Sequence, residues 1–272
     1  MNLTAATRIY GVIGDPVSHS LGPVMHNRAF DITGYPGVYA AFRVKDVKAA
    51  VSGIMALNIA GVSVTIPHKV SIIKHLDAVD EIAEKIGAVN TIVNTDGRLT
   101  GRNSDCDGAV RAIAEHAPLT DQDVMILGAG GAARAVAFGM IRQGARVCIA
   151  SRSRKNGEAL ASALGADFCP LDQVSGESID ILINTTPVGM HPDINAMPIS
   201  ADALHPHMLV MDIVYHPVRT RLLQEAAARG CRIVDGVSMF VYQGAMQFEW
   251  WTKIQAPLEQ MKQAVYAALQ NK

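Results

Sequence analysis

The stretch that decides the fold is DVMILGAGGAARAVAFGMIR, residues 123–142. It opens with an apolar run the size of one buried strand, and a glycine-rich turn and a helical pattern follow. Gly128, Gly130 and Ala133 have the spacing of the G-x-G-x-x-G/A pattern. The first glycine permits a tight turn, the second lets the backbone approach a pyrophosphate, and the small third residue lets helix and strand pack closely. We therefore predict a dinucleotide site with its phosphates at the helix N-terminus.

The next predicted strand indicates which dinucleotide binds. Enzymes that use NAD usually carry an acidic side chain about twenty residues after the glycine loop, where it meets the ribose 2′-hydroxyl. Here that place holds Ser151, Arg152, Ser153, Arg154 and Lys155. Guanidinium groups and hydroxyls suit a 2′-phosphate, whose charge a carboxylate would repel. The segment favours NADP, and a solvated basic helix start is the alternative.

Apolar runs of strand length alternate with helix-length segments, which predicts parallel sheets with helices on both faces. A D-G turn at residues 95–97 lies between short β-prone arms and predicts one hairpin. The length of 272 residues suits two α/β domains, at roughly 150 residues per domain. We predict a substrate domain over residues 1–105, with the two helices of 239–272 packing back on it, and a Rossmann-type NADP-binding domain over 106–238. The predicted strands are 9–13, 38–42, 62–66, 124–127, 147–149, 179–183 and 209–213.

Composition excludes several other classes. Hydrophobic residues make up 49% and charged residues 18% of the chain, which indicates a globular rather than a disordered protein. The 24 basic and 25 acidic residues nearly cancel, so we expect neither nucleic acid nor a membrane surface as a partner. The four cysteines lie far apart without a C-x-x-C pair, which favours reduced thiols over disulfides or a metal site. We expect a cytoplasmic protein with no metal, no signal peptide and no span across a bilayer.

The first half carries four polar clusters beside predicted strands. Ligands of open α/β sheets bind at the carboxyl ends of strands, so these loops are candidates to line one pocket. Each also has an ordinary structural explanation: Ser20 and Asp105 as helix caps, Asn90 as a turn residue, and Lys69 as a solvated lysine. The clusters are GDPVSHSLGPVMHN (14–27), SVTIPHK (63–69), GAVNT (87–91) and GRNSDCDG (101–108).

Taken together and in order, these motifs resemble those of the shikimate dehydrogenase family, which includes the quinate/shikimate dehydrogenases. The resemblance covers nearly the whole chain. It implies a two-domain α/β enzyme that reduces 3-dehydroshikimate to shikimate with NADPH in the cytoplasm, on the route to aromatic amino acids. The matching stretches are SHSLGPVMHN (18–27), VTIPHK (64–69), GAVNT (87–91), GRNSDCDG (101–108), GAGGAARA (128–135), INTTPVGM (183–190), DIVYHP (212–217) and DGVSMFVYQGA (235–245).

The resemblance also implies roles for individual residues. Lys69 and Asp105 are similar to the catalytic pair, and we assign Lys69 as the acid/base and Asp105 as its orienter, with the reverse assignment open. The two catalytic motifs and the cofactor motifs fall in different predicted domains, so we expect the active site in the interdomain cleft. The implied substrate-binding residues are Ser20, Gly22, Thr65, Lys69, Asn90, Asp105, Tyr215 and Gln243, and the implied cofactor-binding residues are Gly128, Ala129, Gly130, Gly131, Ala132, Ser151, Arg152, Ser153, Arg154, Ile213 and Gly236.

The chain departs from the family pattern at four places. Gly22 stands where a second serine holds the substrate carboxylate, so we expect weaker shikimate binding and space for the extra hydroxyl of quinate. A glycine that serves the loop backbone is the alternative there. Ser63 replaces a frequent asparagine, Ser104 a threonine, and Ser151 the asparagine of an N-R-T segment.

Three functions stay open from the sequence. The first is shikimate dehydrogenase, the second a paralogue that acts on quinate or a related cyclohexane carboxylate, and the third an NADP-binding sensor without catalysis. A binding-only protein has no need of a proton-transfer pair, so Lys69 and Asp105 argue against the third. A monomer and a homodimer both suit a chain of this kind.

Overall fold

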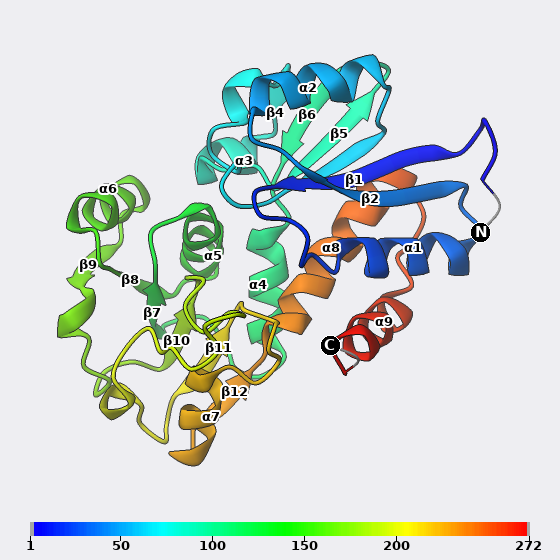
Figure 1. The fold of residues 1–272 in the computed structure, drawn as a ribbon. Coiled ribbons are helices and arrows are strands. Elements are labelled where there is room, and N and C mark those ends of the chain that lie inside the picture. Colours follow the sequence, from blue (N-terminus) through cyan, green and yellow to red (C-terminus); the bar gives the residue numbers. More distant parts are fainter. Residues whose placement is uncertain (1–2, 271–272) are drawn as a thin grey trace. The chain divides into compact units, whose positions relative to one another are not determined.

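The computed structural model describes residues 3–270, and the chain divides into two units. Unit 1 comprises Met1–Ser104 and Gln243–Lys272, and unit 2 comprises Asp105–Tyr242. The chain therefore leaves unit 1 after Ser104 and re-enters it within helix α8 (Gly236–Thr252). Figure 1 shows the elements of both units. The sequence prediction placed these two changes after residues 105 and 238.

Unit 1 is built on a six-stranded sheet of strand order β2-β1-β3-β5-β6-β4. Strands β1, β2 and β3 are parallel, whereas β5 runs antiparallel to both β3 and β6, so the sheet is mixed rather than wholly parallel. The predicted hairpin accounts for the antiparallel pair of β5 and β6, and its turn residues Asp96 and Gly97 both have positive φ, as a two-residue type I′ turn requires. The strands are β1 (Arg8–Gly14), β2 (Gly37–Arg43), β3 (Gly61–Val64), β4 (Ala78–Val79), β5 (Thr91–Thr95) and β6 (Arg98–Arg102).

Helices cover both faces of this sheet, as Figure 1 shows with α2 on one face and α1 and α9 on the other. A cluster of buried aliphatic side chains that includes Val62 and Ile92 forms the core beneath α2. On the other face the indole of Trp251 packs directly on Gly61, where a Cβ atom would lie 2.2 Å from the indole nitrogen. That nitrogen donates to the Ile92 carbonyl. The helices are α1 (Gly22–Thr33), α2 (Val47–Ala56), the 3-10 turn η1 (Ile73–His75), α3 (Glu81–Ile86) and α9 (Leu258–Gln270).

Unit 2 is built on a six-stranded, wholly parallel sheet of order β12-β11-β10-β7-β8-β9. Counted along the chain this is the order 3-2-1-4-5-6 of dinucleotide-binding folds, which confirms the Rossmann-type prediction. The order reverses between β7 and β10, where such sheets bind their ligands. The elements are α4 (Asp105–Ala114), β7 (Asp123–Leu127), α5 (Gly131–Arg142), β8 (Arg146–Ser151), α6 (Arg154–Leu164), β9 (Asp167–Pro170), η2 (Leu171–Gln173), β10 (Ile181–Asn184), η3 (Ala201–Ala203), β11 (Leu209–Asp212), α7 (Arg221–Ala228) and β12 (Arg232–Val234).

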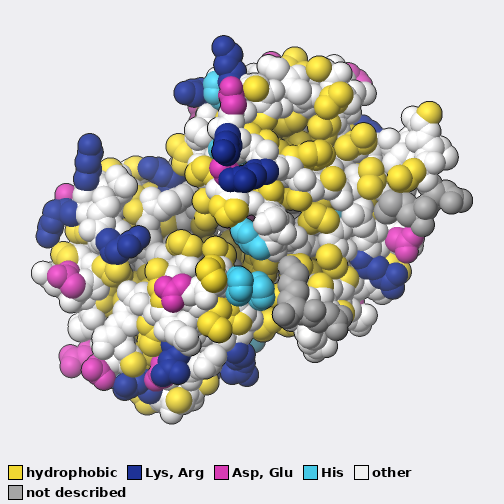
Figure 2. Space-filling view, viewed as in Figure 1, with side chains coloured by type: hydrophobic (Ala, Val, Ile, Leu, Met, Phe, Trp, Pro, Cys, Tyr) yellow, Lys and Arg dark blue, Asp and Glu magenta, His cyan; other side chains and the backbone are white. Residues whose placement is uncertain are grey.

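The surface mixes charges of both signs. On the face drawn in Figure 2, Lys and Arg side chains are interspersed with Asp and Glu, as the formal net charge of −1 leads one to expect. Over residues 3–270, no helix is long and apolar enough to cross a bilayer. The same residues hold no group of three or more His, Cys, Asp or Glu side chains arranged to bind a metal ion.

Candidate active site

The loop that carries Lys69 follows β3 and is anchored on both sides. Thr65 continues the strand, because its N–H donates to the Ile13 carbonyl (3.0 Å). The buried ring of His68 hydrogen-bonds the Val44 carbonyl through Nε2 (2.8 Å). The carbonyl of Lys69 itself accepts from the Val89 N–H (2.8 Å), which holds the lysine backbone beside the GAVNT segment. The lysine therefore extends from a fixed loop.

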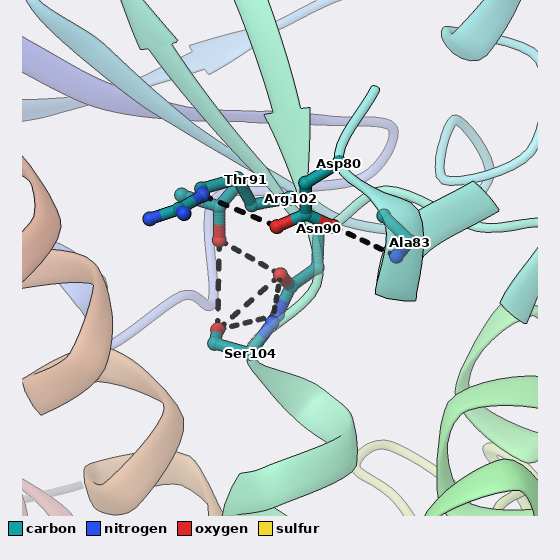
Figure 3. Close-up of polar contacts among 6 residues, drawn as sticks. All are labelled: Asp80, Ala83, Asn90, Thr91, Arg102 and Ser104. Atoms are coloured by element: carbon teal, nitrogen blue, oxygen red, sulfur yellow. Dashed lines mark hydrogen bonds and ion pairs between the residues drawn. The ribbon is translucent and has the colours of Figure 1, made fainter. Parts of the chain in front are cut away.

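Asn90 lies at the centre of a buried polar cluster, shown in Figure 3. Its Oδ1 accepts from the Ser104 N–H (2.8 Å) and from Thr91 Oγ1 (2.7 Å). A backbone N–H can only donate, so this contact fixes which end of the Asn90 amide is the oxygen. The amide nitrogen donates to Ser104 Oγ (2.9 Å) and at 3.4 Å to Gln243 Oε1. The structure thus brings together Asn90 and Gln243, 153 residues apart in the chain.

The same view shows how the start of α3 is held against β6. Asp80 accepts from the Ala83 N–H (2.8 Å) as the helix cap and forms an ion pair with Arg102 (3.1 Å). The guanidinium of Arg102 also lies over the ring of Trp250, 4.6 Å from its centroid. These contacts fix the strand that leads into Ser104 and Asp105.

Gly22 is buried at the first position of α1, and its N–H donates to Ser20 Oγ (3.2 Å). Its φ is outside the left-handed region, so the backbone does not demand glycine. A Cβ atom here would lie 3.1 Å from Tyr39 Cε1, 3.2 Å from the Tyr39 hydroxyl and 3.3 Å from Ser20 Oγ. The open space that the sequence predicts beside Gly22 is therefore not present. The end of the Tyr39 side chain, from strand β2, fills it.

Tyr39 belongs to a second polar network that no sequence motif indicates. Its hydroxyl donates to Ser63 Oγ (2.6 Å), and Ser63 Oγ donates to Gln247 Oε1 (2.6 Å). The Gln247 amide nitrogen donates to Thr91 Oγ1 (2.9 Å) and to the Asn90 carbonyl (3.3 Å). The network thus reaches from the end of Tyr39 to the cluster around Asn90.

His26, on helix α1, contacts two members of this network, Tyr39 and Gln247. It is 1% exposed, its ring stacks on Tyr39 with 4.4 Å between centroids, and it hydrogen-bonds Gln247. Over the described residues, its Nδ1 is a buried polar atom without a hydrogen-bond partner. Burial lowers the pKa of His26 to about 3, against the opposing effect of the bond to Gln247. The imidazole is therefore neutral in the folded protein at neutral pH.

Replacing His26 with phenylalanine should make the free energy of unfolding depend less on pH in the acid range. A pKa lowered on folding contributes stability above the unfolded value of about 6.5, and this is lost as pH falls toward the folded value of about 3. Between pH 6.5 and pH 4.5 the wild-type free energy of unfolding should drop by about 2 kcal/mol through this group. Denaturant unfolding at both pH values measures it, with the exposed His116→Phe as the control. Equal pH slopes for wild type and His26→Phe would contradict it.

In unit 2 the glycine loop joins β7 to α5. Gly128 has φ +118°, and a Cβ atom on it would lie 2.7 Å from Thr185 Oγ1, so both conformation and space demand glycine. Thr185 follows β10 and donates to the Leu127 carbonyl (2.6 Å), so it lies at the reversal of the strand order. Gly130 caps α5, and a Cβ atom on it would meet nothing within 4 Å. Ala129 and Gly130–Ala132 thus form an open backbone cradle at a helix N-terminus, which fits a pyrophosphate.

In the basic segment after β8, some polar and charged side chains are already bonded within the protein and others are not. The Ser151 hydroxyl donates to the Ser153 carbonyl (2.8 Å), and Ser153 caps helix α6. Arg154 forms an ion pair with Glu158 one turn along that helix (2.8 Å). Arg152 is exposed and takes part in none of the ion pairs found over residues 3–270. Arg152, like the exposed Lys155, is therefore a cation of this segment that no described ion pair engages.

The segment after β11 is held by the fully buried Asp212. Its Oδ1 accepts from Asn184 Nδ2 (3.0 Å) and from the Val214 N–H (3.0 Å), and its Oδ2 accepts from Thr220 Oγ1 (2.7 Å). Burial raises the pKa of Asp212 to about 6, although these three donors each oppose that shift. The carboxylate thus fixes both ends of residues 213–220.

Ile213 and Tyr215 lie in that segment. A Cβ atom on Gly236 would lie 2.5 Å from the Ile213 carbonyl oxygen, so the start of α8 approaches this backbone more closely than any larger residue permits. The Tyr215 ring packs on Phe240 with 4.6 Å between centroids. The structure therefore brings Ile213 and Gly236 together.

Family models match most of the chain. Residues 12–92 match the shikimate dehydrogenase substrate binding domain, residues 110–214 the shikimate / quinate 5-dehydrogenase family, and residues 236–266 the shikimate 5′-dehydrogenase C-terminal domain. A shikimate dehydrogenase (NADP(+)) of Geobacillus kaustophilus is 45% identical over 97% of this chain and 99% of its own length. The chain belongs to the shikimate dehydrogenase family.

Solved structures of the family have the same fold. A shikimate dehydrogenase in complex with NADP+ superimposes with a TM-score of 0.95 at 40% identity, with 98% of each chain covered. The enzyme of Thermus thermophilus, in complex with NADP(H) and shikimate, gives a TM-score of 0.90 at 36% identity, over 97% of this chain and 100% of its own. The expected family and fold class are therefore confirmed.

The residues that the resemblance singles out are divided between the two units by their positions in the chain. Three further residues enter only through the structure: Tyr39, Gln247 and Thr185. Thr185 lies inside INTTPVGM and had a motif to signal it, whereas Tyr39 and Gln247 lie in an ordinary strand and helix. Unit 1 carries Ser20, Gly22, Thr65, Lys69, Asn90 and Gln243, and unit 2 carries Asp105, Tyr215 and all the predicted cofactor residues.

Proposed function

We propose that this chain is an NADP-dependent shikimate dehydrogenase, which interconverts 3-dehydroshikimate and shikimate in the shikimate pathway. The observation that carries the proposal is the similarity to shikimate dehydrogenases over almost the whole chain. The free thiols of the four cysteines suit a reducing compartment, and we place the reaction in the cytoplasm.

The reaction removes a proton from a ring hydroxyl and a hydride from the carbon that bears it. NADP, when bound, supplies the acceptor for the hydride. Lys69 Nζ takes the hydroxyl proton in the oxidation of shikimate and returns it in the reduction of 3-dehydroshikimate. Asp105, 5% exposed at the start of α4, orients the lysine and accepts from the substrate.

Substrate hydroxyls bind to Thr65, Asn90 and Gln243, and Tyr215 contributes from unit 2. Asn90 suits this role because its amide is already fixed by the Ser104 N–H, so it needs little reordering when a ligand arrives. Ser20 Oγ accepts from the Gly22 N–H and retains its own proton to donate to the substrate carboxylate.

Unit 2 offers a fitting site for NADP. The open cradle at Gly130 and the N-terminus of α5 receive the pyrophosphate, and Arg152, with Ser153 and Arg154, receives the 2′-phosphate. Ile213 and Gly236 line the nicotinamide. The carboxylate that would signal NAD has no counterpart in residues 151–155.

Replacing Arg152 with alanine should lower kcat/KM for NADP by about tenfold or more, because a charge-assisted contact to phosphate is lost. The value for NAD should stay nearly unchanged. Arg221→Ala is the matched control, since it removes an exposed arginine that pairs with Glu225 outside the proposed NADP site and should leave both values unchanged. Steady-state rates with both cofactors measure the effect. Equal losses for NADP and NAD would show that Arg152 does not bind the 2′-phosphate.

One assay separates the three functions that the sequence leaves open. Formation of the reduced cofactor, NADPH or NADH, is followed with shikimate and with quinate, each with NADP and with NAD. Turnover of shikimate with NADP supports the proposed function, and preferred turnover of quinate favours the paralogue. No turnover with any pair would refute the proposal and favour the sensor.

A further inference from the structure

Asn184, the last residue of β10, lies beside two segments of the proposed cofactor site. In the sheet it pairs with Leu127 on β7, directly before the glycine loop, and with Asp212 on β11, directly before Ile213. Strand β10 adjoins the reversal of the strand order (Figure 1), where sheets of this kind bind dinucleotides. Asn184 is fully buried, so the hydrogen bonds of its side chain are made within the protein.

The contacts of the Asn184 amide can be assigned atom by atom. One end accepts from the Thr186 N–H (3.0 Å), and because a backbone N–H can only donate, this end is the oxygen Oδ1. The same oxygen accepts from Thr186 Oγ1 (2.7 Å). The nitrogen Nδ2 then donates to Asp212 Oδ1 (3.0 Å) and to the Val188 carbonyl (3.3 Å). Both protons of the amide are therefore engaged, and its oxygen has two donors.

These contacts reach two loops that begin at neighbouring strand ends. The β10 loop, residues 185–190, is bonded directly to the Asn184 amide, as just described. The β11 loop, residues 213–220, is held through Asp212, which accepts from Asn184. The Asn184 carbonyl also accepts from the Ile213 N–H (3.0 Å), at the start of the β11 loop. One residue thus bonds to both loops.

Both loops adjoin groups assigned above to the cofactor. In the β10 loop, Thr185 Oγ1 donates to the Leu127 carbonyl (2.6 Å), and a Cβ atom on Gly128 would lie 2.7 Å from this oxygen. The β11 loop begins with Ile213, assigned above to the nicotinamide. Arg152, assigned to the 2′-phosphate, follows β8, which lies on the other side of β7 from β10. A shift of the two loops therefore affects the nicotinamide end and leaves the 2′-phosphate end in place.

We propose that Asn184 is a positioning residue that fixes the β10 and β11 loops and thereby places the nicotinamide for hydride transfer. The inference rests on the proposed function and adds a residue that acts through the two loops. Placement matters because a displacement of about 1 Å at the reacting atoms can slow a reaction by about 10²-fold. The two ends of the cofactor should consequently respond to different substitutions, at Asn184 and at Arg152.

Replacing Asn184 with leucine keeps the branched shape of the side chain and removes its four hydrogen bonds. The kcat for shikimate oxidation should fall about tenfold or more, with NADP and with NAD alike, because both carry the nicotinamide. Adenosine 2′,5′-bisphosphate carries the 2′-phosphate and no nicotinamide, so its inhibition constant against NADP should stay within about twofold of wild type. Asn195→Leu, at an exposed position of the same unit, is the matched control and should change neither value.

A pair of substitutions at Thr186 tests the same contacts if Asn184→Leu does not fold. Thr186→Val removes the hydroxyl that donates to Asn184 and accepts from the Val188 N–H (3.2 Å). The kcat should fall about three- to fivefold, with the inhibition constant of the bisphosphate unchanged. Thr186→Ser retains the hydroxyl and should stay within about twofold of wild type. Equal losses in the valine and serine variants would overturn the inference, since the methyl group would then be responsible.

Other results would overturn it as well. If the bisphosphate inhibits Asn184→Leu more weakly by the same factor by which kcat falls, the unit has loosened as a whole. A loss with NADP but not with NAD would move the effect to the 2′-phosphate. A kcat close to wild type in both Asn184→Leu and Thr186→Val would remove Asn184 from the placement of the cofactor.

The proposed function is judged separately, by wild-type turnover of shikimate in the same assay. If that turnover is absent, the proposed function fails. Calorimetric binding of NADP and of the bisphosphate to the same variants then still tests Asn184. Weaker binding of NADP with unchanged binding of the bisphosphate would support the inference, and an equal change in both would overturn it.

Discussion

Replacing Lys69 with alanine should lower kcat by about 10²–10⁴-fold, with a smaller effect on KM. The loss has this size because the substitution removes the group that we propose as the acid/base of the reaction. The loop itself should survive, since its anchors are the His68 ring and the backbone of Lys69, and alanine keeps both. Initial rates of shikimate oxidation with NADP measure the change.

Two controls make this result specific. Lys74→Ala removes an exposed lysine from the turn that follows the same loop and should leave kcat unchanged. Binding of NADP to Lys69→Ala, followed by calorimetry, should match that of the wild type. Turnover of Lys69→Ala close to the wild-type rate would remove this lysine from the mechanism and move the acid/base role to Asp105.

Replacing Asp212 with alanine should lower the free energy of unfolding by about 3–5 kcal/mol. The substitution leaves three buried donors without an acceptor: Asn184 Nδ2, the Val214 N–H and Thr220 Oγ1. It also frees the segment that carries Ile213, so KM for NADP should rise. Denaturant unfolding followed by circular dichroism measures the stability, and Asp202→Ala, at an exposed carboxylate, is the control. A loss no larger than that of the control would contradict this account.

The pH dependence of that loss has a definite sign. The pKa of Asp212 is raised to about 6 in the folded protein, so the folded state binds this proton more tightly than the unfolded chain does. The stability from the protonated form is present below about pH 4 and is lost as pH rises through 6. The difference in the free energy of unfolding between wild type and Asp212→Ala should therefore become smaller as pH rises from about 4 through 6. This direction is opposite to the effect of His26, whose contribution is lost as pH falls.

The elements that the sequence predicts best are those with a strong local signal. The glycine loop and the hairpin at residues 95–97 each depend on backbone conformations that few residue types allow. Strands β4, β9 and β12 were missed, because they lie at the edges of their sheets, are only partly buried and show no continuous apolar run. The mixed character of the first sheet follows from the hairpin, although the alternation of elements alone favours a parallel sheet.

The candidate site was predicted where its residues lie within motifs and was misjudged where contacts cross the sequence. Asn90 and Gln243 both lie in motifs, and the structure places them in contact. Gly22 suggested empty space because it lacks the side chain of the serine that the family pattern has there. Tyr39, from another element, fills that space, and no pattern around residue 39 indicates this. Packing between distant segments is set by the whole fold, so local sequence does not reveal it.

Both tryptophans of the chain, Trp250 and Trp251, belong to unit 1. Trp251 is 6% exposed and packs on Gly61, and Trp250 lies under the Arg102 guanidinium. Indole emission is therefore a built-in optical reporter of the substrate-binding unit, and melting of the nucleotide-binding sheet passes without a tryptophan signal of its own. Tryptophan emission follows the unfolding of unit 1, whereas ellipticity follows the secondary structure of both units. Recording both on one sample should therefore show which unit unfolds first, without an attached label.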